Sequence, residues 1–124
     1  MTVFATARGC PFCRRHWDQL DVLDSVSTDR DDYAIIRPLH PVTEGHLLVI
    51  PGMHFDSAHA CPWSAGEAVE VAARYIREEL DSDANIITSI GPAATQTVFH
   101  LHVHIVPRRP DDGLTLPWTG QIKD

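Results

Sequence analysis

The chain has 124 residues, of which 44% are hydrophobic and 22% charged, and its formal net charge is −7. These values predict one domain with its own hydrophobic core, and the acidic balance argues against a broad surface for nucleic acids or anionic membranes. No apolar run approaches the ~20 residues of a membrane span, and the N-terminus lacks the features of a signal peptide. Three cysteines are too few for a disulfide scaffold, so we expect a reduced, cytoplasmic protein.

The first thirty residues contain the motif Cys10-Pro11-Phe12-Cys13. One interpretation is a redox motif similar to the opening of a glutaredoxin, with a strand at residues 3–6 and a helix at residues 14–23 that activates the first thiol. The other is half of a zinc site, because two thiolates at this spacing can hold one tetrahedral ion. His16 would be a local third ligand. Plain structural cysteines are a third interpretation, although this spacing is uncommon by chance.

The next part of the chain predicts a pair of strands. Residues 21–32 are polar and acidic and are expected to form a loop, and residues 33–37 read as a strand. The two prolines of residues 38–44 lead to Gly45 and indicate a turn. Residues 46–50 form a continuous apolar run, which predicts a strand buried on both faces and paired antiparallel with the preceding one. Residues 53–63 are expected to be irregular, with a short helical turn as the alternative.

One long helix is predicted over residues 64–80. Ser64 can cap it and Glu67 can return the hydrogen bond, as in a capping box. Apolar residues recur at steps of three and four and define one buried stripe, namely Ala68, Val71, Ala72, Tyr75, Ile76 and Leu80. A third strand follows at residues 85–90 and a loop of small residues at 91–95. The predicted fold is α+β, an antiparallel sheet with one long helix packed on it.

Residues 96–106 alternate between two kinds of side chain. His100, His102 and His104 share one register with Gln96, and the other register is nearly all apolar. On a strand these imidazoles would share one face, roughly 7 Å apart. All three could clamp a metal, or one could attack phosphorus while its neighbours hold the oxygens. A plain polar surface strand is a poor explanation of this composition.

The segment His100-Leu101-His102-Val103-His104-Ile105-Val106 resembles the signature of the histidine triad (HIT) family. The loop at residues 91–98 and the GHLLVIP segment at residues 45–51, followed by His54, are similar to other recurrent parts of that family. The likeness extends over about residues 33–108, most of the chain. It implies a single HIT-like domain over residues 1–124, with a zinc-binding N-terminal segment at 1–30 and a C-terminal tail at 109–124.

The resemblance also implies a metal centre. The branch of the family with an N-terminal Cys-x-x-Cys pairs it with two histidines, which by position are His54 and His100. The expected structural zinc ligands are therefore Cys10, Cys13, His54 and His100. His40, His46 and His59 suit this role less well, and His46 is expected to be a hydrogen-bonded structural histidine beside the core.

For the chemistry, the resemblance implies a nucleotidyl hydrolase or transferase. His102 would form a covalent nucleotidyl-histidine with a nucleoside phosphate ester, anhydride or phosphoramidate. Its other ring nitrogen must then donate to an acceptor, expected to be a backbone carbonyl near His46 or on the neighbouring strand. His104 would donate to a phosphate oxygen or the leaving group, and Gln96 would bridge the two.

Further contacts to substrate are expected around the triad. Thr97 and the backbone N–H groups of residues 91–95 can add donors. Arg108 can neutralise charge at the end of the strand, although a solvated arginine would fit equally well.

Three positions depart from the family pattern. Thr95 stands where glycine is usual before the glutamine, Pro38 stands where a ribose-binding residue is usual, and Glu44 replaces a proline. The Pro38 departure leaves a second class open, a non-catalytic nucleotide- or metal-binding module of the same fold. In either class the expected ligand is a small nucleotide. The resemblance also implies a homodimer, in which Trp118 either reaches the partner's site or packs as an ordinary side chain.

Overall fold

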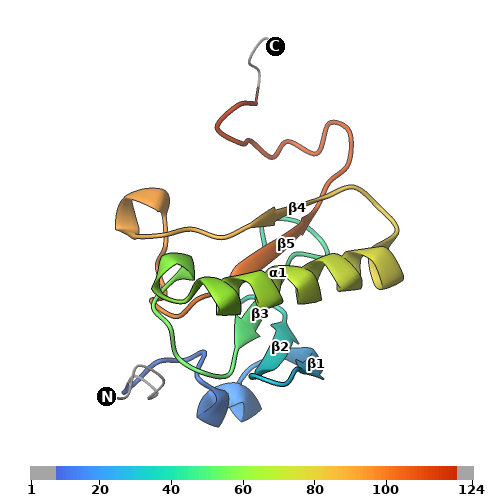
Figure 1. Ribbon diagram of the computed structural model, residues 1–124. Coiled ribbons are helices and arrows are strands. Elements are labelled where there is room, and N and C mark those ends of the chain that lie inside the picture. The colour runs from blue at the N-terminus through green and yellow to red at the C-terminus, as the bar shows by residue number, and fades with distance from the viewer. Residues whose placement is uncertain (1–7, 120–124) are drawn as a thin grey trace.

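The computed structural model describes residues 8–119, which form a five-stranded antiparallel sheet of order β1-β2-β3-β5-β4. One long helix, α1, lies across one face of this sheet (Figure 1). The predicted α+β architecture is therefore confirmed. The strands are β1 (Val22–Ser27), β2 (Asp32–Ile36), β3 (Leu47–Pro51), β4 (Ala84–Ile87) and β5 (Val103–Pro107). The helices are α1 (Pro62–Tyr75), which continues as a π-helical turn (Ile76–Leu80), and short 3₁₀ helices at Arg14–Gln19, Ala58–Ala60 and Pro92–Ala94.

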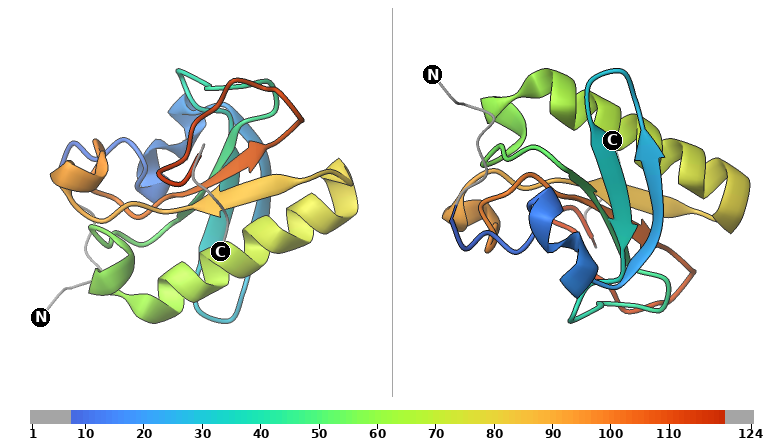
Figure 2. Two further views of the ribbon diagram at one scale, coloured as in Figure 1. Left: turned by 90° about the horizontal axis from the view of Figure 1, so that it is seen from above. Right: turned by 90° about the horizontal axis from the view of Figure 1, so that it is seen from below.

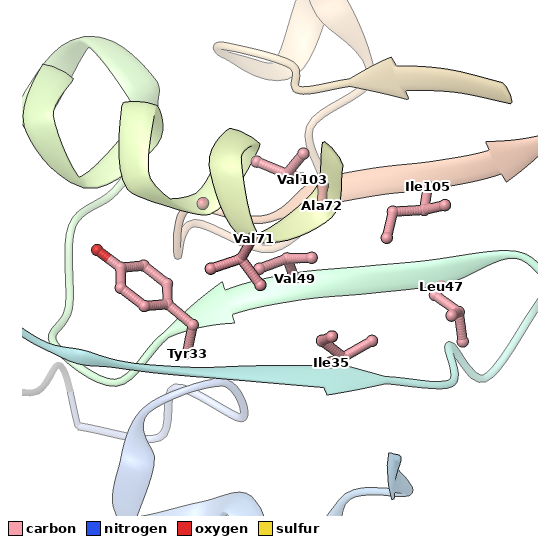
Figure 3. Packing of buried hydrophobic residues seen from close by; sticks show 9 residues of the cluster. Tyr33, Ile35, Leu47, Val49, Val71, Ala72, Val103 and Ile105 are labelled. Carbon is pink, nitrogen blue, oxygen red and sulfur yellow. The ribbon is translucent and has the colours of Figure 1, made fainter. Parts of the chain in front are cut away.

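The main core lies between α1 and the sheet (Figure 3). The predicted helix stripe supplies one side, with Ala68, Val71 and Ala72 buried and the remaining three stripe residues packed against them. Alternate residues of β2, β3 and β5 supply the other side, including Val49, Val103 and Ile105. Because side chains alternate along a strand, His104 must point to the face away from α1.

The second face of the sheet is covered by the N-terminal segment (Figure 2). Phe12, Trp17 and Leu20 pack against the apolar residues that β2 and β3 present on this side, Ala34, Ile36, Leu48 and Ile50. All residues of β3 are buried, as predicted for a strand covered on both sides. The segment that carries the two N-terminal cysteines therefore lies on the same face as His104.

The prediction of a loop over residues 21–32 is wrong, because this region contains β1. The strand is mostly exposed, and only Val26 is half-buried. It pairs antiparallel with β2, with a register shift between Val22 and Asp24. An edge strand with no buried face has no apolar alternation, so backbone pairing with a neighbour forms it without a local sequence signal.

The predicted start of the helix is also wrong. Helix α1 begins at Pro62, after Cys61 at the N-cap, and Ser64 lies inside the helix. Proline suits the first helical position because its missing N–H would have no partner there. Glu67 does not return a capping bond; its carboxylate accepts hydrogen bonds from the Tyr33 hydroxyl at 2.7 Å and the Thr28 hydroxyl at 2.9 Å.

The histidine-rich segment is a strand only at its end. β5 starts at Val103, so His100 and His102 precede it, and the expectation of one uninterrupted strand from residue 96 is wrong. Its pairing with β3 runs from Val49 opposite Val103 to Leu47 opposite Ile105. The turn before β3 is as predicted: Gly45 has φ +85°, and an added Cβ would lie 3.1 Å from the Pro107 side chain. Within residues 8–119, no helix is both long and apolar enough to cross a membrane.

Candidate active site and metal centre

Cys10, Cys13, His54 and His100 form one buried cluster, with all four potential ligand atoms within 4.8 Å of one another. The His100 Nδ1 atom lies 3.3 Å from Cys10 Sγ and 3.7 Å from Cys13 Sγ. The His54 Nδ1 atom lies 3.5 Å from Cys13 Sγ and 3.2 Å from His100 Nδ1. Residues that are 41 to 90 positions apart in sequence are thus brought together around one point.

These distances fit a tetrahedral zinc ion. Zn–S bonds of about 2.3 Å and Zn–N bonds of about 2.0–2.1 Å imply ligand separations of about 3.6 Å for S···N and about 3.3 Å for N···N. The other nitrogen of each imidazole is already occupied. His100 Nε2 donates to the Pro51 carbonyl at 2.8 Å, and His54 Nε2 lies 2.9 Å from an Asp56 carboxylate oxygen. Such partners fix the tautomer that presents Nδ1 to a metal.

The structure fits the other interpretations of Cys10 and Cys13 less well, namely a zinc site with His16 and a redox motif. His16 Nδ1 lies 2.6 Å from the Cys10 carbonyl oxygen and not in the cluster. The helix that the redox interpretation requires at residues 14–23 is only a short 3₁₀ helix, Arg14–Gln19, followed by β1. The strand expected at residues 3–6 lies outside the described residues. Cys61 is buried at the start of α1, apart from the cluster.

His102 is oriented by the backbone of its own triad. Its Nδ1 atom lies 2.8 Å from the His100 carbonyl oxygen. Because a carbonyl only accepts, Nδ1 carries the proton and Nε2 keeps a lone pair. The expectation that this acceptor lies near His46 or on the neighbouring strand is therefore wrong. Burial lowers the pKa of His102, which favours the neutral ring.

A chain of two hydrogen bonds through His46 determines which ring nitrogen of His104 carries the proton. The Val42 backbone N–H donates to His46 Nδ1 at 3.1 Å, so the neutral ring of His46 carries its proton on Nε2. His46 Nε2 lies 2.9 Å from His104 Nδ1, which must then accept. Neutral His104 therefore carries its proton on Nε2 and can donate it to a ligand. Burial lowers the pKa of His104 to about 4, and the ring centroids of His102 and His104 are 5.2 Å apart.

Gln96 lies close to this site but is engaged by the backbone. Its side-chain NH₂ donates to the carbonyls of Asp56 at 2.6 Å and Val98 at 3.0 Å, and its oxygen accepts the Gly91 N–H at 2.8 Å. The loop N–H groups of Ala94 and Thr95 donate within the loop itself. Thr97 is exposed. The direct roles expected for Gln96, Thr97 and this loop in substrate binding stay predictions.

Arg108 is not a solvated side chain. Its guanidinium makes a two-pronged ion pair with Asp112, at 2.8 Å and 3.1 Å, and donates to the Asn85 side chain at 2.7 Å and the Leu114 carbonyl at 3.1 Å. This arrangement fastens the segment after β5 to β4. A cavity of about 470 Å³ lies between them, lined by His46, His104 and Arg108 together with residues of both elements.

Three residues near the site were not singled out by the sequence reasoning. Phe12 packs edge-on against His100 and His102, with ring centroids 6.0 Å and 5.5 Å apart. Asp56 contacts His54, and the spacing His-x-Asp was a local signal that could have suggested it. Asp31 is buried next to the loops that carry the cysteines and His54, and no local sequence pattern distinguishes it from the other acidic residues around it.

Three histidines, one in a Cys₂His₂ cluster and two with opposite ring nitrogens protonated, on a five-stranded sheet with one long helix, define the class of histidine triad proteins. The family profile described as HIT domain matches residues 20–111. The chain belongs to this family.

Individual relatives support this assignment. The chain is 29% identical to the adenosine 5′-monophosphoramidase of Saccharomyces cerevisiae, covering 93% of this chain and 73% of that protein. It is 34% identical to an adenylylsulfatase of Arabidopsis thaliana over 68% of this chain, but spans only 46% of that protein's length. Among solved structures, a Zn-bound histidine triad family protein from Mycobacterium smegmatis is 33% identical, with a TM-score of 0.70 over 86% of this chain and 80% of that one.

Proposed function

We propose that the protein is a nucleotidyl hydrolase or transferase that acts through a covalent intermediate on His102. The observation that carries this proposal is the hydrogen bond from His102 Nδ1 to the His100 carbonyl, which leaves a neutral nucleophilic nitrogen at Nε2. In the first step Nε2 forms a bond to phosphorus and the bond from phosphorus to the leaving group breaks. In the second step water or another acceptor displaces His102, and the nucleotide is released.

His104 is proposed as the proton and hydrogen-bond donor for these steps. Its Nε2–H can stabilise the charge that develops on a phosphate oxygen or transfer its proton to the leaving group. His46 holds it in the donor tautomer through the 2.9 Å contact with its Nδ1. Gln96 is proposed to act mainly by shaping the loop, through its three bonds to backbone atoms, and Arg108 to line the cavity beside His104. Thr97 is proposed to add a hydroxyl donor for the substrate, because its side chain is exposed next to Gln96.

The relatives support a substrate with a nucleoside phosphate. Two of them bear the names of an adenosine 5′-monophosphoramidase and an adenylylsulfatase. We extend this to the present chain as a nucleoside phosphate ester, anhydride or phosphoramidate. The alternative is a nucleotide-binding module of the same fold that lacks turnover, and the two differently protonated imidazoles favour the enzyme.

One experiment distinguishes the enzyme from the nucleotide-binding module that lacks turnover. The protein is mixed with an adenosine phosphoramidate, quenched in acid-free conditions within milliseconds to seconds, and digested for mass spectrometry. We expect an adenylyl adduct on the peptide that contains His102, together with steady release of AMP. Nucleotide binding without adduct or turnover would support the module instead.

We also propose that Cys10, Cys13, His54 and His100 bind one structural zinc ion per chain. The geometric fit and the Zn-bound relative from Mycobacterium smegmatis support this. When bound, zinc would tie the N-terminal segment to the residue whose carbonyl orients His102. Metal analysis of the pure protein should give one zinc per chain, and Cys10→Ser should lower both the zinc content and the melting temperature. A metal-free protein that folds normally, with Cys10 and Cys13 cycling through a disulfide, would restore the redox interpretation.

We also propose a domain organisation, a cellular location and an oligomeric state for the protein. The N-terminal segment and the HIT fold are proposed to act as one domain, because the two cysteines complete the cluster with His54 and His100. A thiolate-containing site suits a reduced compartment, which supports a cytoplasmic location. A homodimer is proposed on the basis of the exposed edge of β4.

A further inference from the structure

Asp31 is a buried carboxylate with three donors around it. Its side chain has no exposed area. One oxygen accepts the Asp32 backbone N–H at 2.8 Å and an Arg14 guanidinium N–H at 3.2 Å. The other oxygen accepts the Met53 backbone N–H at 3.0 Å. Burying a carboxylate is costly unless donors replace the lost water, so these bonds offset the cost of burying the Asp31 side chain.

Two of these donors stand directly beside candidate metal ligands in the sequence. Arg14 follows Cys13, and Met53 precedes His54. Asp31 accepts hydrogen bonds from these two neighbouring residues. It therefore links the loop that carries Cys10 and Cys13 to the loop that carries His54.

The same junction contains further backbone hydrogen bonds, one between the two loops and one from the His54 loop to the start of β2. The Arg14 backbone N–H donates to the Gly52 carbonyl at 3.2 Å, and the Gly52 N–H donates to the Asp32 carbonyl at 2.8 Å. A Cβ added at Gly52 would lie 2.8 Å from Arg14 Nε, so the Arg14 guanidinium would have to shift from its present place beside Asp31. The Cys13 loop, through Arg14, and the His54 loop, through Met53, thus both donate hydrogen bonds to Asp31.

We propose that Asp31 is a positioning residue for the metal centre, which holds the Cys13 loop and the His54 loop at the separation that a tetrahedral ion requires. The proposal rests on the proposed metal site. A carboxylate is suited to this task because both of its oxygens accept, so each can face a different chain segment, whereas an amide of the same size has one accepting oxygen and one donating nitrogen.

The test compares Asp31→Asn with Asp32→Asn in the full chain. Asparagine has nearly the same shape but turns one acceptor into a donor that would face either Met53 N–H or the Arg14 and Asp32 donors. Asp32 is the matched control, because its carboxylate also pairs with Arg14, at 3.1 Å, but is 38% exposed. Zinc affinity is measured by competition with a chromophoric chelator, and the visible spectrum of the cobalt(II)-substituted protein reports tetrahedral coordination.

We expect Asp31→Asn to weaken zinc binding roughly 10–100-fold, as for other groups that orient metal ligands, and to alter the cobalt spectrum. Asp32→Asn should change the affinity less than about 3-fold, because it leaves the Met53 bond intact. A wild-type-like affinity in Asp31→Asn, with an equal loss of stability in zinc and in chelator, would show a purely structural role and overturn the proposal.

A second variant covers the case in which Asp31→Asn fails to fold. Arg14 is about half exposed, so Arg14→Ala should fold while it removes one of the three donors. We expect it to weaken zinc binding several-fold more than Arg15→Ala, an exposed neighbour, and an equal affinity in the two would overturn the proposal. If the wild-type protein binds no zinc, the proposed metal site itself is contradicted. That outcome is distinct from one in which wild type binds zinc and the Asp31 variant behaves like it.

Discussion

At the scale of single residues, the triad histidines have different partners and should have different phenotypes. His102→Asn should abolish turnover while the fold and nucleotide affinity remain, because asparagine has no nitrogen able to form the covalent bond. The loss should be several orders of magnitude in kcat, against roughly 10²–10³-fold for His104→Asn, which removes one donor. His100→Asn should lower metal content and stability as well. Steady-state kinetics with circular dichroism tests this, and an active His102→Asn protein would contradict it.

Neutral buried histidines also predict how stability depends on pH. Burial lowers the pKa of His46, and that of His104 to about 4, whereas an unfolded histidine titrates near 6.5. Between these values the unfolded chain binds more protons, so the free energy of unfolding should fall as the pH drops from about 6.5 toward 4. Urea unfolding should show a shallower pH slope in His104→Asn than in wild type.

The control for the pH prediction is the exposed His40. His40→Asn should keep the wild-type slope under the same metal conditions. A slope that is equal in wild type and His104→Asn would mean that His104 does not contribute.

At the scale of elements, the loop before the triad is strained at Thr95. This residue has φ +72° and ψ 19°, a left-handed conformation that glycine adopts without steric cost. Glycine, which the resemblance leads us to expect at this position, would adopt this conformation without strain. Thr95→Gly should raise the free energy of unfolding by up to about 1 kcal/mol.

The matched control for Thr95 is its neighbour Ala94, which lies in the 3₁₀ helix Pro92–Ala94 and has no positive φ. Ala94→Gly should lower stability by about 0.5–1 kcal/mol, because glycine loses more backbone entropy on folding. Chemical denaturation measures both variants. The same sign of change in the two would argue that strain at Thr95 is absent in solution.

At the scale of the whole molecule, β4 is an edge of the sheet. Ile86 is 37% exposed, and Ile90 just beyond the strand is 46% exposed. Such an edge is suited to pairing with a second copy. Light scattering should therefore give twice the chain mass of 13.8 kDa at micromolar concentration, and Ile86→Lys should shift it to the monomer. A wild-type monomer across this range would contradict the homodimer.

The sequence by itself determined the features that depend on local order along the chain. The helix stripe and the buried run of β3 are periodic patterns, and both lie where they were predicted. The alternation around the triad forms a strand only from Val103 onward. The four members of the metal cluster were also identified from sequence, but through the resemblance to a family and not through spacing alone.

Only the tertiary structure decided the features that depend on partners distant in sequence. β1 forms because β2 offers its backbone, and an exposed edge strand has no pattern of its own. The acceptor for His102, the engagement of Gln96 by backbone atoms and the burial of Asp31 depend on where the chain folds back. Hydrogen-bond partners of this kind are set by three-dimensional proximity, which composition and periodicity do not encode, and the protonation pattern of the site follows from them.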